Sequence, residues 1–177
     1  MMSKISTILV DDEIKNNELL NIYLDKYCPK IEVVGIATTV EDAINKINGL
    51  QPNLIFLDIV LHDGTGFDVL EGVQHNDFSV VFITAFQEYA VTAFKFNAID
   101  FLLKPIDPKD LITTVNTIEE NIKNKLYTTT PQLESAKTSI ATKTSDYNFI
   151  AIPSTKKIDF IKIDDILYFE SDGRYTR

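Results

Sequence analysis

Short apolar segments alternate with amphipathic helical patterns along the first two thirds of this chain, and this alternation limits its fold more than any other feature. Five segments rich in β-branched and aromatic residues are typical of strands and cover residues 5–10, 31–37, 54–57, 80–83 and 99–103. Helical patterns follow at residues 13–27, 40–48, from 66 onward, 87–96 and 108–123. Because such alternation favours right-handed crossovers, we predict an α/β fold with a doubly wound, five-stranded parallel sheet.

The pattern stops after residue 124, and this divides the chain into three parts. Residues 125–147 are rich in Thr, Ser and Lys and have no sustained apolar period, so we predict a flexible linker. Residues 148–177 show short alternating apolar segments with turn signals at Pro153-Ser154 and Asp172-Gly173, which is typical of β-structure. Since thirty residues bury little surface, we expect this last part to be a short, incomplete all-β segment.

Charge and cysteine content exclude several classes of function. Residues 1–124 hold 9 Lys and no Arg against 19 acidic residues, a net charge of −10, so this part should repel nucleic acid. A single cysteine, Cys28, excludes an internal disulfide and suits a reducing compartment. No apolar run reaches the length of about eighteen residues that a membrane span needs. We therefore expect a cytoplasmic protein without a membrane partner.

A carboxylate, Asp58, directly follows the apolar segment 54–57, although burial of an unpaired charge is costly. The carboxyl ends of the other segments also carry polar groups: Asp11-Asp12 after the first, Thr84 at the fourth and Lys104 after the fifth. In a flavodoxin-like sheet of order 2-1-3-4-5, these ends are neighbours at the edge where ligands bind. We therefore expect these side chains to converge.

The converging groups suit phosphoryl transfer. Clustered carboxylates repel one another, and Mg²⁺ relieves this with oxygen ligands while leaving room for phosphate oxygens. Lys104 offers a point charge and Thr84 a hydroxyl for a phosphoryl group. Since an aspartate carboxylate can itself be a nucleophile, Asp58 is the candidate that would form an acyl phosphate.

Four motifs in order resemble the receiver domain of two-component response regulators: LVDDE at 9–13, FLDIVLHDGTGFDVL at 56–70, ITAF at 83–86 and FLLKPI at 101–106. The resemblance covers residues 1–124 and implies a flavodoxin-like (CheY-like) fold. It implies that Asp58 accepts a phosphoryl group from a sensor histidine kinase, as a phosphoacceptor signalling protein and not an enzyme. Mg²⁺ would be held by Asp11, Asp12, Asp58 and the main-chain carbonyl of Val60.

The same resemblance implies a switch pair, and two side chains near Asp58 bear on how long the acyl phosphate lasts. Thr84 and Phe101 would form the switch pair, with the hydroxyl moving toward the phosphoryl group and the ring turning inward. Lys104-Pro105 is the candidate cis peptide, since only X-Pro bonds adopt cis at modest cost. Neither Val60 nor Phe86 can orient a water molecule beside the acyl phosphate, so we predict slow autodephosphorylation.

A second resemblance concerns the output of the protein. TAFQEYAVTAFKFNAIDFLLKPI at 84–106 is similar to receivers of the LytTR (LytR/AlgR-like) branch, and KIDFIKIDDILYFESDGRYT at 157–176 resembles the first strands of a LytTR-type DNA-binding domain. Residues 148–177 would then be the N-terminal third of that module, and DNA would bind only through the complete C-terminal domain. The branch also implies a homodimer on phosphorylation, with Tyr89, Phe96 and Ala98 as candidate dimer surface.

Simpler alternatives stand beside these interpretations. Taken alone, Asp58 is typical of a capping residue at a strand-to-helix turn. Asp11-Asp12-Glu13 is typical of an acidic first turn of a helix. The aromatic stretch at 89–101 is typical of core packing. A stand-alone phospho-switch that acts through protein contacts is a further alternative.

Other site chemistries fit the sequence less well. A phosphatase of the haloacid-dehalogenase type needs a second Asp where Val60 stands, and HDGT at 62–65 has Leu61 at the nucleophile position. GTG at 64–66 has Val69 where a dinucleotide fingerprint requires glycine. His62 and His75 are too few for a transition-metal site, and we interpret both as surface residues.

Overall fold

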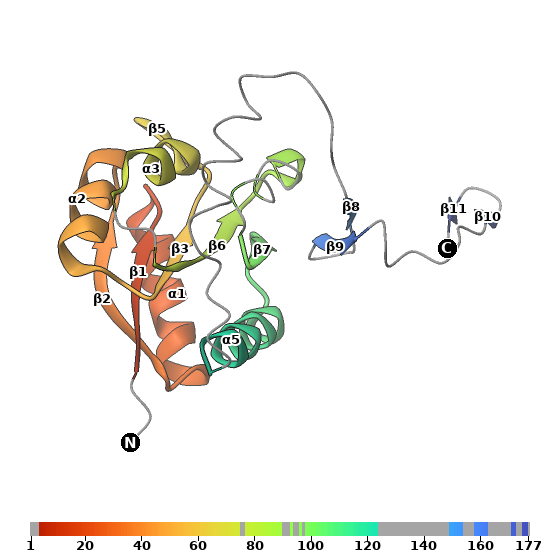
Figure 1. Cartoon of the computed structure of the whole chain (residues 1–177), viewed down its shortest axis with the longest axis horizontal. Helices are drawn as coiled ribbons and strands as arrows, with labels where there is room; N and C mark the ends of the chain where they lie inside the picture. Colours follow the sequence, from red (N-terminus) through yellow and green to blue (C-terminus); the bar gives the residue numbers. More distant parts are fainter. Residues whose placement is uncertain are drawn as a thin grey trace.

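The structure is a computed structural model that describes residues 4–74, 77–89, 93, 96 and 98–123, together with four strands in the last thirty residues. Its main sheet has five parallel strands in the order β2-β1-β3-β6-β7 (Figure 1). The strands are β1 (Ile5–Val10), β2 (Ile31–Ala37), β3 (Leu54–Leu57), β6 (Ser79–Thr84) and β7 (Asp100–Leu103). Two-residue strands β4 (Val60–Leu61) and β5 (Gly64–Thr65) pair with each other in a separate hairpin. The sheet therefore has the predicted order 2-1-3-4-5.

Helices cover both faces of the sheet. Helix α1 (Ile14–Tyr27) and helix α5 (Pro108–Lys123) pack on one face, while α2 (Val40–Leu50) and α3 (Gly66–Gly72) pack on the other. Side-chain caps stabilise the N-termini of three helices. At α2 the Thr39 side chain accepts from the Asp42 N–H, and at α3 Thr65 forms a capping box with Asp68. At α5 the Asp107 side chain accepts from the Lys109 N–H. These caps set the points at which the chain leaves the strand ends.

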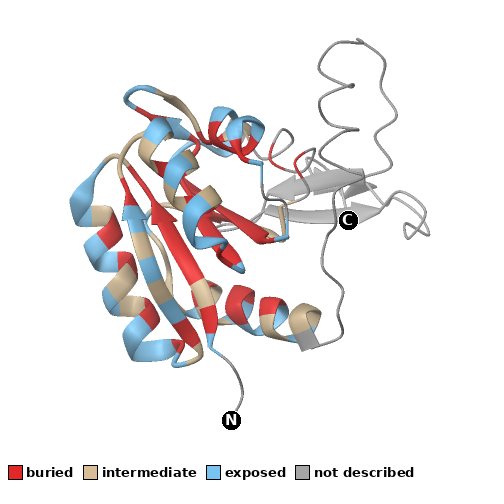
Figure 2. Ribbon diagram, turned by 60° about the vertical axis from the view of Figure 1, so that its left-hand side comes forward, coloured by how far each residue is buried: buried red, intermediate tan, exposed pale blue. Residues whose placement is uncertain are grey.

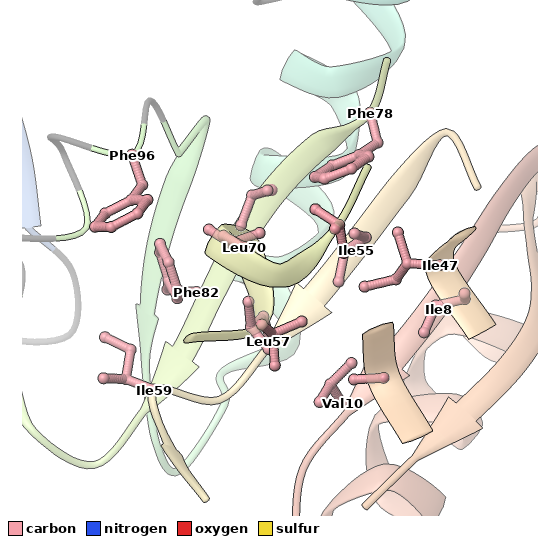
Figure 3. Packing of buried hydrophobic residues seen from close by; sticks show 14 of the residues in the cluster. Ile8, Val10, Ile47, Ile55, Leu57, Ile59, Leu70, Phe78, Phe82 and Phe96 are labelled. Atoms are coloured by element: carbon pink, nitrogen blue, oxygen red, sulfur yellow. The ribbon is translucent and has the colours of Figure 1, made fainter. Parts of the chain in front are cut away.

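Two apolar clusters, one on each face of the sheet, form the core. On the α2/α3 face, Ile8, Ile55, Leu57 and Phe82 pack beneath the helices, as Figure 3 shows. On the α1/α5 face, residues such as Phe56 belong to the second cluster. Every residue of β3 and β6 is buried, and Figure 2 shows these central strands in red. Burial on both faces explains why these strands read as continuous apolar runs and not as alternating patterns.

The predicted helix at 87–96 is described only in part. Gln87–Tyr89 forms one turn of 3-10 helix, and Ala93 and Phe96 are buried in the α2/α3-face cluster. The other residues of this segment lie outside the described part of the chain.

The last part of the chain contributes two antiparallel strand pairs. Strand β8 (Phe149–Pro153) pairs with β9 (Ile158–Lys162), and β10 (Ser171–Asp172) pairs with β11 (Tyr175–Thr176). The predicted linker at 125–147 lies outside the described residues, and the three-part division of the chain stays a prediction. None of the described helices is both long and apolar enough to cross a membrane.

Candidate functional site

Asp58 lies at the carboxyl end of β3, next to the end of β1. Its N–H donates to the main-chain oxygen of Val10 over 2.8 Å, and its Oδ1 accepts from the Val60 N–H over 3.1 Å. The residue is 6% exposed. These bonds place a nearly buried carboxylate in the crevice between β1 and β3, where the strand order reverses and α/β sheets bind their ligands.

The chain after Asp58 folds back tightly on the aspartate backbone. The Gly66 N–H donates to the main-chain oxygen of Ile59 over 2.9 Å. A Cβ atom at Gly66 would lie 2.4 Å from the Asp58 carbonyl oxygen, which is closer than real Cβ contacts. Only glycine therefore allows this close approach of α3 to the Asp58 loop.

Asp11 is fixed by the first turn of α1. Its Oδ1 accepts from the Glu13 N–H over 2.9 Å and from Asn16 Nδ2 over 3.1 Å. Asn17 Nδ2 donates to the main-chain oxygen of Asp11 over 2.8 Å. The helix thus holds this 6% exposed carboxylate in one orientation beside Asp58.

Lys104 bridges the two buried carboxylates. Its Nζ lies 2.5 Å from Asp58 Oδ2 and 2.7 Å from Asp11 Oδ2, and its N–H donates to the Thr84 main-chain oxygen over 2.9 Å. The Lys104-Pro105 peptide bond is cis. Burial lowers the pKa of Lys104, but the hydrogen bonds and charges of Asp11 and Asp58 outweigh it, so the net pKa is raised. The ammonium group is therefore charged at neutral pH.

Asp12 completes a cluster of three carboxylates. Oxygens of Asp11, Asp12 and Asp58 lie within 4.8 Å of one another. Lys104 compensates the first and third, whereas Asp12 has no cation on it among the described residues. This donor set consists of hard oxygens with excess negative charge, which fits a divalent cation such as Mg²⁺. Val60, whose carbonyl is the predicted further ligand, is 38% exposed beside the cluster.

The predicted switch residues are both fully buried. The Thr84 Oγ1 accepts from the Phe86 N–H over 3.4 Å, and within the described part of the chain no hydrogen bond joins it to Asp58. Phe101 is 0% exposed and belongs to the α2/α3-face cluster, so its ring points inward. Their role as a switch pair stays a prediction.

The predicted dimer surface needs one correction. Phe96 is only 3% exposed, because it stacks on Phe67 with ring centroids 4.9 Å apart, so it is a core residue. Tyr89 and Ala98 are partly buried against the same cluster. His62 is largely exposed, as expected for a surface residue, and His75 lies outside the described residues.

Sequence reasoning missed three residues that position the site. Asn16 and Asn17 hold Asp11, and Gly66 admits the Asp58 loop. The GTG triplet at 64–66 was a visible signal, but we weighed it only against a dinucleotide fingerprint, which it does not fit because Val69 stands where glycine is required. Two Asn residues one turn after an acidic pair were a weaker signal, since Asn is common near helix starts.

Comparison with known proteins now identifies the family. The family described as "Response regulator receiver domain" matches residues 7–116, which include every residue of the carboxylate cluster and Lys104. The chain belongs to the response regulator receiver family. Receivers are signalling proteins of two-component systems.

Relatives of this response regulator extend over nearly the whole chain. The sensory transduction protein LytT of Bacillus cereus is 30% identical over 175 residues, 97% of this chain and 68% of the relative. The transcriptional regulatory protein BtsR of Salmonella typhi is 30% identical over 169 residues, 94% of this chain and 66% of the relative. These similarities connect the chain with regulators of the LytTR type.

Solved receiver structures share the fold. The response regulatory domain of mrkE from Klebsiella pneumoniae superposes with a TM-score of 0.62 at 26% identity, covering 67% of this chain and 98% of that one. The receiver domain of AraT from Geobacillus stearothermophilus gives a TM-score of 0.63 at 24% identity, covering 69% and 98%. The parallel sheet with its helices on both faces is therefore the receiver architecture.

Proposed function

We propose that Asp58 accepts a phosphoryl group from the phosphohistidine of a sensor histidine kinase. The observation that carries this proposal is the Lys104 ammonium group, which lies 2.5 Å from one oxygen of Asp58 beside two further carboxylates. An Asp58 oxygen attacks phosphorus, and the new O–P bond forms as the P–N bond breaks. The imidazole nitrogen keeps the electron pair and takes up a proton. The product is an acyl phosphate on Asp58.

Each neighbour of Asp58 has a defined task in this step. Lys104 compensates the charge of the phosphoryl oxygens, because its ammonium group already lies on the nucleophile. Asp11, Asp12, Asp58 and the Val60 carbonyl would hold Mg²⁺, which supplies further charge neutralisation on those oxygens when it is bound. Asp11 stays oriented through the α1 contacts. The site thus works by positioning and charge.

Phosphorylation would then bias a two-state receiver. The Thr84 hydroxyl, now bound by the Phe86 N–H, would turn toward the phosphoryl group, and Phe101 would keep its buried position. The phosphorylated form would dimerise through the surface that includes Tyr89 and Ala98, while Phe96 supports that surface from the core. Size-exclusion chromatography with light scattering, with and without beryllofluoride, tests this dimerisation.

The output that we propose is control of transcription through a complete LytTR-type DNA-binding domain. Its support is the β-type sequence at 148–177 and the names of the relatives LytT and BtsR. The acidic first domain instead favours the alternative, a switch that acts through protein contacts alone. A salt-dependent shift of a promoter fragment by a form with the complete C-terminal domain separates the two, and no specific shift would contradict transcriptional control.

Small phosphodonors test the phosphoacceptor directly. The full chain, incubated with phosphoramidate and Mg²⁺, should gain the mass of one phosphoryl group, and EDTA should prevent the gain. Asp58→Asn should not gain it. Asp63→Asn is the matched control in the same loop: Asp63 caps α2 by accepting from the Val40 N–H, and asparagine keeps that acceptor. Equal labelling of Asp58→Asn and the wild type would refute the proposal.

A further inference from the structure

Two neighbouring asparagines of α1 hold the acidic pair Asp11-Asp12 through different atoms. Asn16 Nδ2 donates to the Asp11 carboxylate oxygen Oδ1 over 3.1 Å, and Asn17 Nδ2 donates to the Asp11 main-chain oxygen over 2.8 Å. Asn16 is partly buried and Asn17 is 1% exposed. Since a hydrogen bond to an ionised carboxylate is roughly twice as strong as one between neutral groups, Asn16 restrains the Asp11 side chain strongly.

The hydrogen bond of Asn17 acts on Asp12 as well as on Asp11. The oxygen that accepts it belongs to the planar peptide unit that joins these two residues. The other side of Asp11 is also fixed, because its N–H donates to the Ala37 main-chain oxygen over 3.2 Å. Asn17 therefore fixes the stretch of backbone that carries two of the three carboxylates in the cluster with Asp58.

Packing does not explain why position 17 is an asparagine. Its Oδ1 is buried and makes no hydrogen bond within the described part of the chain, and such an acceptor destabilises the folded state. Asn17 lines a cavity of about 360 Å³ together with apolar residues such as Leu20, Tyr23 and Phe56. A leucine would fill a similar volume there without an unpaired polar atom. What distinguishes the asparagine is its hydrogen bond to the peptide unit between Asp11 and Asp12.

We propose that Asn16 and Asn17 set the affinity of the carboxylate cluster for its divalent cation, as positioning residues that contact the ligands and not the ion. Replacing a hydrogen-bond partner of a metal ligand commonly weakens metal binding by about 10- to 100-fold. Asn16 is such a partner of the Asp11 carboxylate, and Asn17 acts through the peptide unit that two ligands share. The inference rests on the proposed cation site, but it does not depend on whether Asp58 accepts phosphate.

Titration of the unphosphorylated full chain with Mn²⁺ measures this affinity. Mn²⁺ prefers the same oxygen ligands as Mg²⁺, and the electron paramagnetic resonance signal of the free ion gives the Kd. Asn16→Ala and Asn17→Leu should each raise the Kd for Mn²⁺ about tenfold. Asn21→Ala removes an amide farther along α1 that does not hold Asp11, and it should leave the Kd within about twofold of the wild-type value.

Urea unfolding in EDTA separates positioning from a general structural role. Asn17→Leu should unfold at a urea concentration at least as high as the wild type does, because it removes the unpaired Oδ1. The Asp11 oxygen that it frees adjoins a cavity with room for water. Ile118→Val removes a methyl group from the core of the α1/α5 face without contacting the carboxylate cluster, so it should lower the urea midpoint and leave the Kd unchanged.

Three results would overturn the inference. If the wild type binds Mn²⁺ and both asparagine variants bind it equally well, the inference fails while the proposed cation site stands. If the wild type shows no saturable Mn²⁺ binding, the cation site and the inference fail together. If Ile118→Val raises the Kd as much as the asparagine variants do, lost stability alone explains the effect. Asn16→Ala changes a partly exposed residue and keeps the test decisive if Asn17→Leu does not fold.

Discussion

Neutralising Asp12 should stabilise the protein in the absence of divalent cations. Two like charges 4.8 Å apart, the largest separation within the cluster, repel by about 3.5 kcal/mol at an effective dielectric constant of about 20. Asp12 lies near two carboxylates, Asp11 and Asp58, and near one ammonium group, Lys104. The attraction of the ammonium group offsets the repulsion of one carboxylate, so a net repulsion of about one like-charge pair remains on Asp12. Solvent screening at this partly exposed side chain halves it. Asp12→Asn should therefore raise the free energy of unfolding by about 1–2 kcal/mol.

Magnesium should remove most of this difference in stability. At tenfold excess over its Kd, a bound cation stabilises the folded wild type by about 1.4 kcal/mol, and Asp12→Asn should lose this gain because it loses a ligand. Urea unfolding followed by circular dichroism, in EDTA and in MgCl₂, measures both effects. Asp25→Asn removes the same charge from the exposed side of α1 and should change stability by less than about 0.5 kcal/mol. A lower stability of Asp12→Asn in EDTA, or an equal gain from MgCl₂, would refute the reasoning.

Three further perturbations test other parts of the structure. Gly66→Ala should lower the free energy of unfolding by about 3 kcal/mol, because the new Cβ would lie 2.4 Å from the Asp58 carbonyl oxygen. Gly72→Ala should be nearly neutral, because its Cβ would lie 2.4 Å from Ile44 Cδ1, the movable end of a side chain. Urea unfolding of both variants measures the difference. Burial, and then the charge of Glu119, raise the pKa of Cys28 from 9.0 to about 11. Between pH 9 and pH 11 the unfolded chain therefore loses the thiol proton while the folded chain keeps it, and the free energy of unfolding should fall by about 2–3 kcal/mol. A Cys28→Ala variant whose free energy of unfolding falls equally with pH would contradict this. Val60→Asn should speed decay of the acyl phosphate, measured as phosphate release, because asparagine can orient water, and slower decay would count against the predicted long lifetime.

Fold elements were predictable where their signals were local. Helix α5 covers Pro108–Lys123, as its amphipathic pattern at 108–123 predicts, and the continuous apolar runs of β3 and β6 mark strands buried on both faces. Helix α2 instead runs to Leu50, two residues beyond its predicted end. Its C-cap Gln51 adopts the left-handed conformation with φ 47°, and nothing in the sequence signals this, since glycine or asparagine is the usual residue there.

The site was predictable where it depends on strand ends and not where it depends on contacts between loops. Parallel strands bring Asp11, Asp58 and Lys104 together whatever the loops do. The burial of Phe96 instead depends on Phe67, a ring from α3 that no local pattern connects with it. The approach of Gly66 to the Asp58 carbonyl likewise depends on the β4–β5 hairpin, which sequence patterns did not predict.

Hydride trapping of the phosphorylated residue tests the central claim most directly. Borohydride reduces the acyl carbon of an aspartyl phosphate to an alcohol with release of phosphate, so the modified residue becomes homoserine. After treatment of the full chain with phosphoramidate and Mg²⁺, peptide mass spectrometry should find homoserine at position 58, and it should be absent when the phosphodonor is omitted. Homoserine at Asp11, Asp12 or Asp63 in place of Asp58 would contradict the account.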